Sequence, residues 1–181
     1  GMTMVSAGNI SGVYLHGPVG RGKTAMMDLF FKTLPDTTPK RRVHFHEFML
    51  DVQAFLHDLR RAGTHGVDDA LPKFAAHVAQ TARVLCFDEF HVLDVADAMI
   101  LARLFTALFA AGVVVVMTSN VAPDDLYAGG LQRDLFLPFI DLIKSKMQVV
   151  PVAGPHDYRT DRVAGRPVYF SPLSPSTDRA M

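Results

Sequence analysis

Eight residues near the start of the chain have the types and spacing of a loop that binds the phosphates of a nucleotide. They follow the pattern G-x-x-x-x-G-K-[ST], known as Walker A. Gly17 and Gly22 can adopt backbone angles that let N–H groups converge on an anion. Lys23 would reach the β- and γ-phosphates, and the hydroxyl of Thr24 would bind Mg²⁺. We therefore expect a nucleotide site formed by Gly17, Pro18, Val19, Gly20, Arg21, Gly22, Lys23 and Thr24.

A second stretch supplies carboxylates that would complete such a site. The apolar run 84–87 is typical of a strand buried on both faces of a parallel sheet, and it is followed directly by Asp88 and Glu89. Ligands of parallel sheets bind at the carboxyl ends of the strands, which is where these two residues would lie. This Walker B pattern predicts that Asp88 binds Mg²⁺ and that Glu89 activates the attacking water as a general base.

A polar residue follows the next buried strand, predicted over 113–117. Asn120 would lie beside the two carboxylates, where its amide could orient the attacking water or sense the γ-phosphate. Asn is also common in turns, so a purely conformational role stays open.

The elements that must position these residues alternate between strands and helices. Strands are expected at 12–16, 43–46, 84–87, 113–117 and 148–152. Helices are expected after the phosphate loop up to Pro35, over 48–59, from Asp68 with Pro72 in the first turn, over 94–111, from Pro123, and around 136–143 with Pro138 near the first turn. This alternation predicts an α/β fold with a parallel sheet covered by helices.

Two basic or histidine-rich features have weaker functional interpretations. If 43–46 is a strand, His44 and His46 share a face, but the sequence offers no further Cys/His ligands for a metal, so ordinary hydrogen bonding is favoured. The run 40–42, Lys-Arg-Arg, could contact a phosphate backbone, although three basic residues at a strand entry are usually solvated.

The composition of the chain argues against several classes of protein. The chain has 181 residues, 49% of them hydrophobic, a mean hydropathy of +0.19 and a formal net charge of +0, so no overall field attracts nucleic acid or an anionic membrane. The single cysteine, Cys86, excludes an intrachain disulfide and fits a cytoplasmic location. The apolar run 104–117 is shorter than the ~20 residues of a membrane span. Gly112 divides it, so we expect buried core and no transmembrane segment, with peripheral membrane contact left open.

With these motifs in place, the chain resembles the ZapE-type AAA+ ATPases, a family of bacterial cell-division ATPases and their mitochondrial relatives of the "ATPase family gene one" type. The similar motifs span most of residues 12–170. They are GPVGRGKT (17–24), RRVHFHEFM (41–49), VLCFDEFHVLDVADAMIL (84–101), TSN (118–120), LYAGGLQRDLFLPFI (126–140) and HDYR (156–159).

The resemblance implies a P-loop NTPase with an AAA+ core, a five-stranded sheet in the order 5-1-4-3-2, and ATP rather than GTP as substrate. It also implies that Asn120 is the first sensor residue, that Arg133 is an arginine finger, and that the protein acts on a protein partner and forms a homo-oligomer when full length. We expect a tag remnant and lead-in over 1–11, the ATPase core over 12–152, and the start of a helical lid over 153–181 that lacks the rest of the lid.

The leading hypothesis is therefore an Mg²⁺-dependent ATPase that remodels or regulates a protein such as a component of the division machinery. A helicase-loader-like ATPase acting with nucleic acid is the alternative. The neutral charge makes it less favoured. A nucleotide-gated scaffold is a third possibility, but it would not need a water-activating Glu89.

Overall fold

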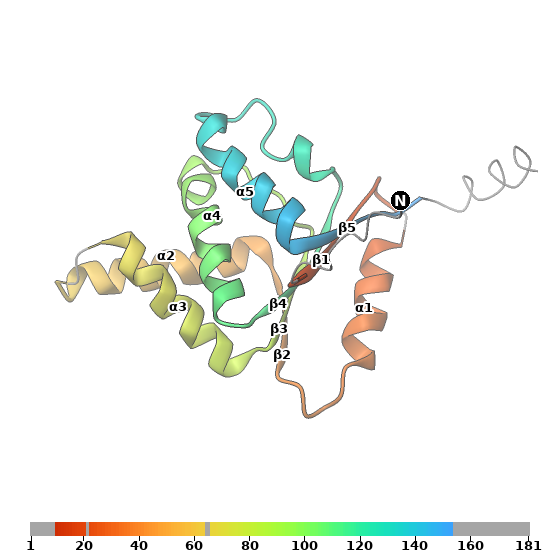
Figure 1. Ribbon diagram of the computed structural model, residues 1–181, viewed down its shortest axis with the longest axis horizontal. Coiled ribbons are helices and arrows are strands. Elements are labelled where there is room, and N and C mark those ends of the chain that lie inside the picture. The colour runs from red at the N-terminus through yellow and green to blue at the C-terminus, as the bar shows by residue number, and fades with distance from the viewer. Residues whose placement is uncertain (1–9, 21, 64–65, 154–181) are drawn as a thin grey trace, which may run out of the picture.

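The computed structural model describes residues 10–20, 22–63 and 66–153, and these form a parallel sheet with helices on both sides (Figure 1). The strands are β1 Gly12–His16, β2 Lys40–His44, β3 Val84–Asp88, β4 Val114–Ser119 and β5 Met147–Pro151. The helices are α1 Lys23–Thr33, α2 Phe45–Arg61, α3 Val67–Thr81, α4 Val95–Ala110 and α5 Arg133–Lys146, with a short 3₁₀ turn, η1, at Pro123–Asp125.

All paired strands of the sheet run parallel, in the order β2-β3-β4-β1-β5. Read from the other edge, this is 5-1-4-3-2, so the predicted α/β class and strand order are confirmed. Because parallel neighbours must be joined by crossovers, each connection carries a helix or a long loop across a face of the sheet. The carboxyl ends of the strands consequently meet at one edge.

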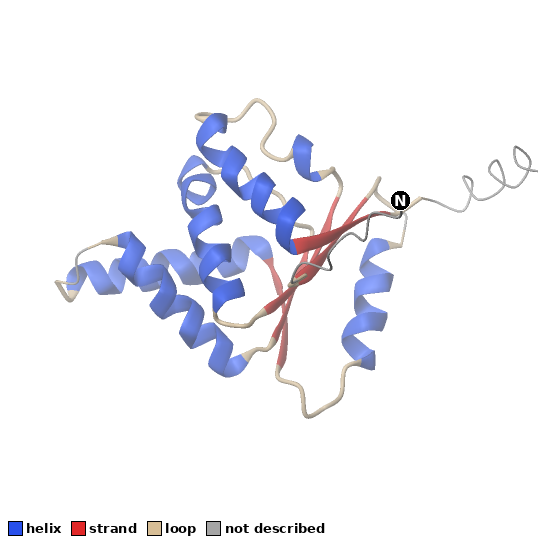
Figure 2. Ribbon diagram, in the orientation of Figure 1, coloured by secondary structure: helices blue, strands red, loops and turns tan. Residues whose placement is uncertain are grey.

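The two faces of the sheet are covered unequally. Of the helices in the described residues, α1 covers one face, whereas α2, α3, α4 and α5 lie on the other (Figures 1 and 2). A small cluster under α1 contains Met27, Val84, Cys86 and Val116. The large cluster on the opposite face includes Leu85, Phe87, Val115 and Met117, together with the aromatic residues Phe48, Phe90, Phe105 and Phe139.

Strand β3 shows why the central strands are apolar throughout. Val84 and Cys86 face α1, whereas Leu85 and Phe87 face the four-helix side, and all of them are buried. A strand covered on both faces places no apolar side chain in water, which explains the continuous run that the sequence displays.

The boundary between β2 and α2 corrects the predicted strand 43–46. The strand ends at His44, and Phe45 begins a helix whose buried face includes Phe45, Phe48 and Val52. His46 is thus helical and does not share a strand face with His44. No group of three or more His, Cys, Asp or Glu side chains with the proximity of metal ligands occurs in the described part of the chain.

Two proline positions also differ from prediction. Pro72 and Pro138 each occupy the sixth position of their helix, because α3 begins at Val67 and α5 at Arg133, earlier than expected. The stretch after Pro123 forms a 3₁₀ turn only over Pro123–Asp125. The expected lid start falls in 154–181, outside the described residues.

The apolar run 104–117 divides as predicted. Leu104 and Leu108 belong to the buried side of α4, and the part from Val114 onward is β4. None of the helices in the described ranges is long and apolar enough to cross a membrane.

Candidate nucleotide site

The phosphate loop (residues 17–24) connects β1 to α1, as the sequence predicts. The N–H of Gly17 donates to the carbonyl oxygen of Ser119 at 3.1 Å, which joins the start of the loop to the end of β4. Gly22 has φ +82° directly before α1, a left-handed conformation that favours glycine. The loop therefore leads into α1 at the carboxyl edge of the sheet, where the positive end of the helix dipole lies. Arg21 lies outside the described residues.

Lys23 is held inside this loop. Its ammonium donates to the carbonyl oxygens of Gly17 at 2.5 Å and Pro18 at 2.9 Å, and the residue is only 8% exposed. Burial lowers the pKa of Lys23, while the nearby carboxylate of Asp88 acts in the opposite direction. A cation thus lies where a phosphate cradled by the loop would need one.

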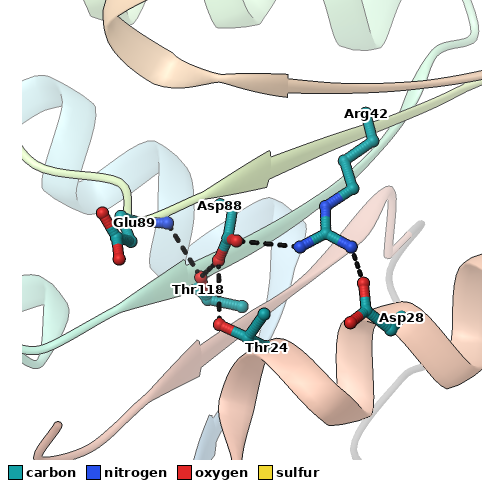
Figure 3. Close-up of polar contacts among 6 residues, drawn as sticks. All are labelled: Thr24, Asp28, Arg42, Asp88, Glu89 and Thr118. Atoms are coloured by element: carbon teal, nitrogen blue, oxygen red, sulfur yellow. Dashed lines mark hydrogen bonds and ion pairs between the residues drawn. The ribbon is translucent and has the colours of Figure 1, made fainter.

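Asp88, at the end of β3, is the most densely hydrogen-bonded side chain of the site (Figure 3). One carboxylate oxygen, Oδ1, accepts from the hydroxyls of Thr118 at 2.9 Å and Thr24 at 3.2 Å. The other, Oδ2, accepts from Arg42 at 2.8 Å. Burial raises the pKa of Asp88, but the hydrogen bonds from these residues outweigh that effect and hold the pKa below its ordinary value.

Sequence reasoning missed Arg42, treating the basic run 40–42 as a solvated strand edge. Its side chain bridges the carboxylates of Asp88 on β3 and Asp28 on α1. The alternation of β2 places Val43 in the large core cluster, so Arg42 must face the α1 side of the sheet. The alternation in the sequence could have indicated the direction of Arg42, but identifying Asp88 as its partner required knowing that β2 pairs with β3.

Glu89 has an unusual backbone conformation that is held by Thr118. Its φ is +52°, the left-handed region that non-glycine residues seldom adopt. The Glu89 N–H donates to the Thr118 hydroxyl at 3.0 Å, and the Phe90 N–H donates to the Thr118 carbonyl oxygen at 2.7 Å. The Glu89 carboxylate points away from that of Asp88 (Figure 3), which leaves the two acids free for different tasks.

Asn120 is exposed directly after β4. The following residue, Val121, is fixed by two buried partners: the Tyr14 hydroxyl donates to its carbonyl oxygen at 2.9 Å, and its N–H donates to Ser119 Oγ at 3.3 Å. Burial raises the pKa of Tyr14 to about 12, so this hydroxyl remains a donor across the physiological range.

One cavity of about 190 Å³ joins the predicted site residues. It is lined by Val19, Gly20, Gly22, Lys23, Thr24, Glu89, Thr118, Ser119 and Asn120. A larger hollow of about 1070 Å³ lies between α3, α4 and α5, but its lining contains none of the predicted nucleotide or catalytic residues. The smaller cavity is the candidate site because it combines the phosphate loop, a carboxylate and the Asn120 amide.

Arg133 does not line that cavity. It begins α5, and its guanidinium donates to the backbone carbonyl oxygens of Asp124 at 2.5 Å and Leu126 at 3.3 Å. Within the described part of the chain its contacts are with carbonyl oxygens and not with Asp134 or Asp141. The structure therefore brings together Lys23, Thr24, Asp88, Glu89 and Asn120, but not Arg133.

The donors beside the loop suit a hard divalent cation. The Thr24 hydroxyl and the ionised Asp88 carboxylate are in contact, and oxygen donors of this kind are those that Mg²⁺ prefers. Because Mg²⁺ in nucleotide sites retains waters and binds phosphate oxygens, few protein ligands are needed. The residues present fit such an ion.

Sheet order, phosphate loop and acidic strand end together define a P-loop NTPase with an AAA+ core. The chain belongs to the AFG1-like ATPase family, whose model matches residues 3–181. It is 45% identical over 172 residues to the cell division protein ZapE of Escherichia coli K12, covering 95% of this chain and 44% of that protein. It is 44% identical over 178 residues to lactation elevated protein 1 homolog B of Danio rerio, covering 94% of this chain and 35% of the relative. The chain thus spans less than half of either relative.

Solved structures show the same fold at low sequence identity. The DnaC helicase loader superposes with a TM-score of 0.56 at 15% identity, covering 79% of this chain and 78% of that one. Domain III of the Thermotoga maritima replication initiation protein DnaA gives 0.54 at 19% identity, covering 86% and 60%. These likenesses concern the fold and carry no information about function.

Proposed function

We propose that this ATPase binds ATP with Mg²⁺ at the phosphate loop, hydrolyses it with Glu89 as general base, and uses turnover to remodel or regulate a protein partner. The observation that carries the proposal is the cavity in which the phosphate loop, Glu89 and Asn120 meet, beside the contact between Thr24 and Asp88.

Each side chain has a role that its position supports. Lys23 would pair with the phosphates, exchanging its bonds to the loop carbonyls for bonds to phosphate oxygens. Thr24 and Asp88 would hold the Mg²⁺, which when bound neutralises charge on the phosphates. Glu89 would accept a proton from the attacking water, and Asn120 would orient that water or contact the γ-phosphate.

Arg133 is proposed to act on the nucleotide of a neighbouring copy. Its position outside the cavity of its own chain supports an action in trans and weighs against a role in cis. An arginine finger stabilises the charge that develops on the transferred phosphate.

The protein partner and the location are part of the same proposal. The ZapE relative is described as a cell division protein, which makes division machinery a reasonable class of partner for this chain too. The proposal places the activity in the cytoplasm, a location with which a chain that has a single cysteine is compatible.

Substitution of Glu89 tests the chemical step separately from binding. Glu89→Gln should retain ATP affinity by calorimetry and lose hydrolysis by ~10²-fold or more, since general-base catalysis contributes that much. Arg41→Ala, which removes an exposed ion pair with Asp51, is the matched control. If Glu89→Gln hydrolysed ATP at the parent rate, the assigned base would be wrong. The variant, held in its ATP-bound form, also provides the bait for identifying the protein partner.

A salt titration of single-stranded DNA binding tests the helicase-loader alternative. The proposed function expects weak binding with a shallow salt dependence, because the chain carries no net charge. Tight binding with a steep dependence would favour the nucleic-acid alternative.

A further inference from the structure

The Arg42 guanidinium lies between two carboxylates that belong to different elements (Figure 3). Nη2 donates to Asp88 Oδ2 at 2.8 Å, and Nη1 forms an ion pair with Asp28 Oδ1. Arg42 is on β2, Asp88 ends β3, and Asp28 is on α1, the helix that starts at the phosphate loop. One side chain therefore connects the acidic strand end to the helix that follows the loop.

This contact determines how Asp88 presents its two oxygens. With Oδ2 bound to Arg42, Oδ1 faces the hydroxyls of Thr118 and Thr24. Asp88 is only 8% exposed, so few waters are available to replace a lost partner. Arg42 directs one terminal nitrogen to each carboxylate, and because the guanidinium is planar and rigid, the two contacts fix each other's direction.

We infer that Arg42 is a positioning residue for the metal–nucleotide site: it holds Asp88 with Oδ1 turned toward Thr24 and, through Asp28, couples that orientation to α1. The inference rests on the proposed function, in which Thr24 and Asp88 hold Mg²⁺. Partners that orient a ligating group in this way typically contribute ~10- to 100-fold in metal affinity or activity.

If Arg42 acted only through its charge, its removal would change the Mg²⁺ affinity in the opposite direction. The direction of that change therefore tests the inference. A guanidinium next to a metal ligand repels a cation, so a purely electrostatic Arg42 would weaken Mg²⁺ binding and its removal would strengthen it. A positioning Arg42 strengthens Mg²⁺ binding. Lysine separates the two roles further, since it retains the charge but cannot bridge two carboxylates with a rigid fork.

The experiment measures binding of a fluorescent ATP analogue to the chain, first without Mg²⁺ and then across a Mg²⁺ titration. Arg42→Ala should leave Mg²⁺-free binding unchanged and raise the half-saturating Mg²⁺ concentration by roughly 10- to 100-fold. Arg42→Lys should fold like the parent and remain impaired in the same direction. Arg41→Ala, whose ion pair with Asp51 is exposed, should stay within about twofold of the parent.

Other outcomes would overturn the inference. A half-saturating Mg²⁺ concentration that is unchanged or lower in both Arg42 variants would leave no positioning role. Equal losses of Mg²⁺-free and Mg²⁺-dependent binding, with a lower melting temperature, would show that Arg42 only supports the fold. Asp88→Asn tests the proposed metal site itself. If this variant does not change the Mg²⁺ dependence of binding, Asp88 is not a Mg²⁺ ligand, and the inference about Arg42 is wrong as well.

Discussion

Thr118 contacts both acidic positions of the site through one hydroxyl group. The hydroxyl donates to Asp88 Oδ1 and accepts from the Glu89 N–H, and the residue is only 1% exposed. A left-handed non-glycine residue such as Glu89 carries a conformational cost of ~1–3 kcal/mol and persists when its neighbours hold it in place. Thr118 is the neighbour that does so.

Removing this hydroxyl should affect stability and turnover together. Thr118→Val keeps the shape of the side chain but removes both the acceptor of the partly buried Glu89 N–H and a buried donor to Asp88 Oδ1, which costs ~1–3 kcal/mol. We expect that loss in urea unfolding, together with a lower kcat because Glu89 is no longer held in its orientation. Thr118→Ser, which keeps the hydroxyl, is the control and should remain near the parent. A Val variant with parental stability and kcat would show that the contact has no effect.

Lys23 supplies the second prediction at this scale. Lys23→Ala removes the buried ammonium that lies within the phosphate loop, so ATP binding should fall below detection by calorimetry. The melting temperature should change little, because among the described residues the hydrogen bonds of the ammonium go to two loop carbonyls, and its burial lowers its pKa. Undiminished ATP affinity in a folded variant would refute the assignment of the loop.

The sequence predicts residues of the site where neighbours in the chain form a pattern. Lys23, Thr24, Asp88 and Glu89 belong to contiguous motifs, and the structure places all of them around one strand edge. The roles of Arg42 and Thr118 depend on contacts with Asp88 across separations of 46 and 30 residues. Such partners follow only from the strand order, so no local pattern indicates them.

At the scale of elements, the junction of β2 and α2 shows where periodicity becomes ambiguous. Val43 and Phe45 are both buried, as in an alternating strand, but Phe45 and Phe48 are also spaced as in a helix. A window of four residues cannot separate a period of 2 from one of 3.6. The structure resolves the ambiguity because the helical face of α2 buries Phe48, Met49, Val52 and Leu56 against the large core cluster.

The segment before α5 depends on a close contact between Tyr127 and Gly130. The Tyr127 ring packs against Phe136, its hydroxyl donates to the Leu131 carbonyl oxygen at 2.8 Å, and a Cβ on Gly130 would lie 2.3 Å from the ring. Only glycine leaves the space that this ring occupies. Through the contact with Phe136, this packing joins the segment before α5 to the first turn of that helix.

Gly130→Ala should therefore destabilise the protein by ~1–3 kcal/mol through overpacking. A double-mutant cycle with Tyr127→Ala tests whether a clash with the ring causes this loss of stability. Without the ring, the added methyl group should lower the free energy of unfolding by nearly nothing. Urea unfolding measures all four corners of the cycle. Additive effects of the two substitutions would rule out a clash with the ring as the cause.

At the scale of the whole molecule, the strand order brings the site together. Strands β3 and β4 are neighbours, and β4 pairs with β1, so the ends that carry Asp88, Thr118 and the phosphate loop meet at one edge. The alternation of strands and helices predicts a parallel sheet, but residue periodicity does not predict which strands are neighbours. The strand order was predicted from the family resemblance.

A second copy of the chain is needed to test Arg133. Its guanidinium binds carbonyl oxygens of the segment 124–126 and lies outside its own nucleotide cavity. A finger supplied in trans contributes ~10³–10⁵ in rate, so Arg133→Ala should lose hydrolysis and keep ATP binding. Mixing Arg133→Ala with Glu89→Gln, each inactive alone, should restore part of the activity, since some interfaces then join an intact Glu89 to an intact Arg133.

The mixing experiment has a clear opposite outcome. If mixed assemblies form, as native mass spectrometry can verify, and activity does not return, Arg133 does not act in trans. Full activity of Arg133→Ala alone would mean that its bonds to the Asp124 and Leu126 carbonyl oxygens are its only role.

Because of its position, alkylation of Cys86 can be used to measure the opening of the central sheet. The thiol is fully buried between β3 and α1, burial raises its pKa to about 11, and it is the only cysteine in the chain. An alkylating reagent reacts with a thiolate and so must wait until the central strand is exposed. With reclosing faster than alkylation, the labelling rate in native buffer therefore measures the population of the opened sheet, and the decrease on adding ATP measures how much nucleotide binding stabilises the closed state.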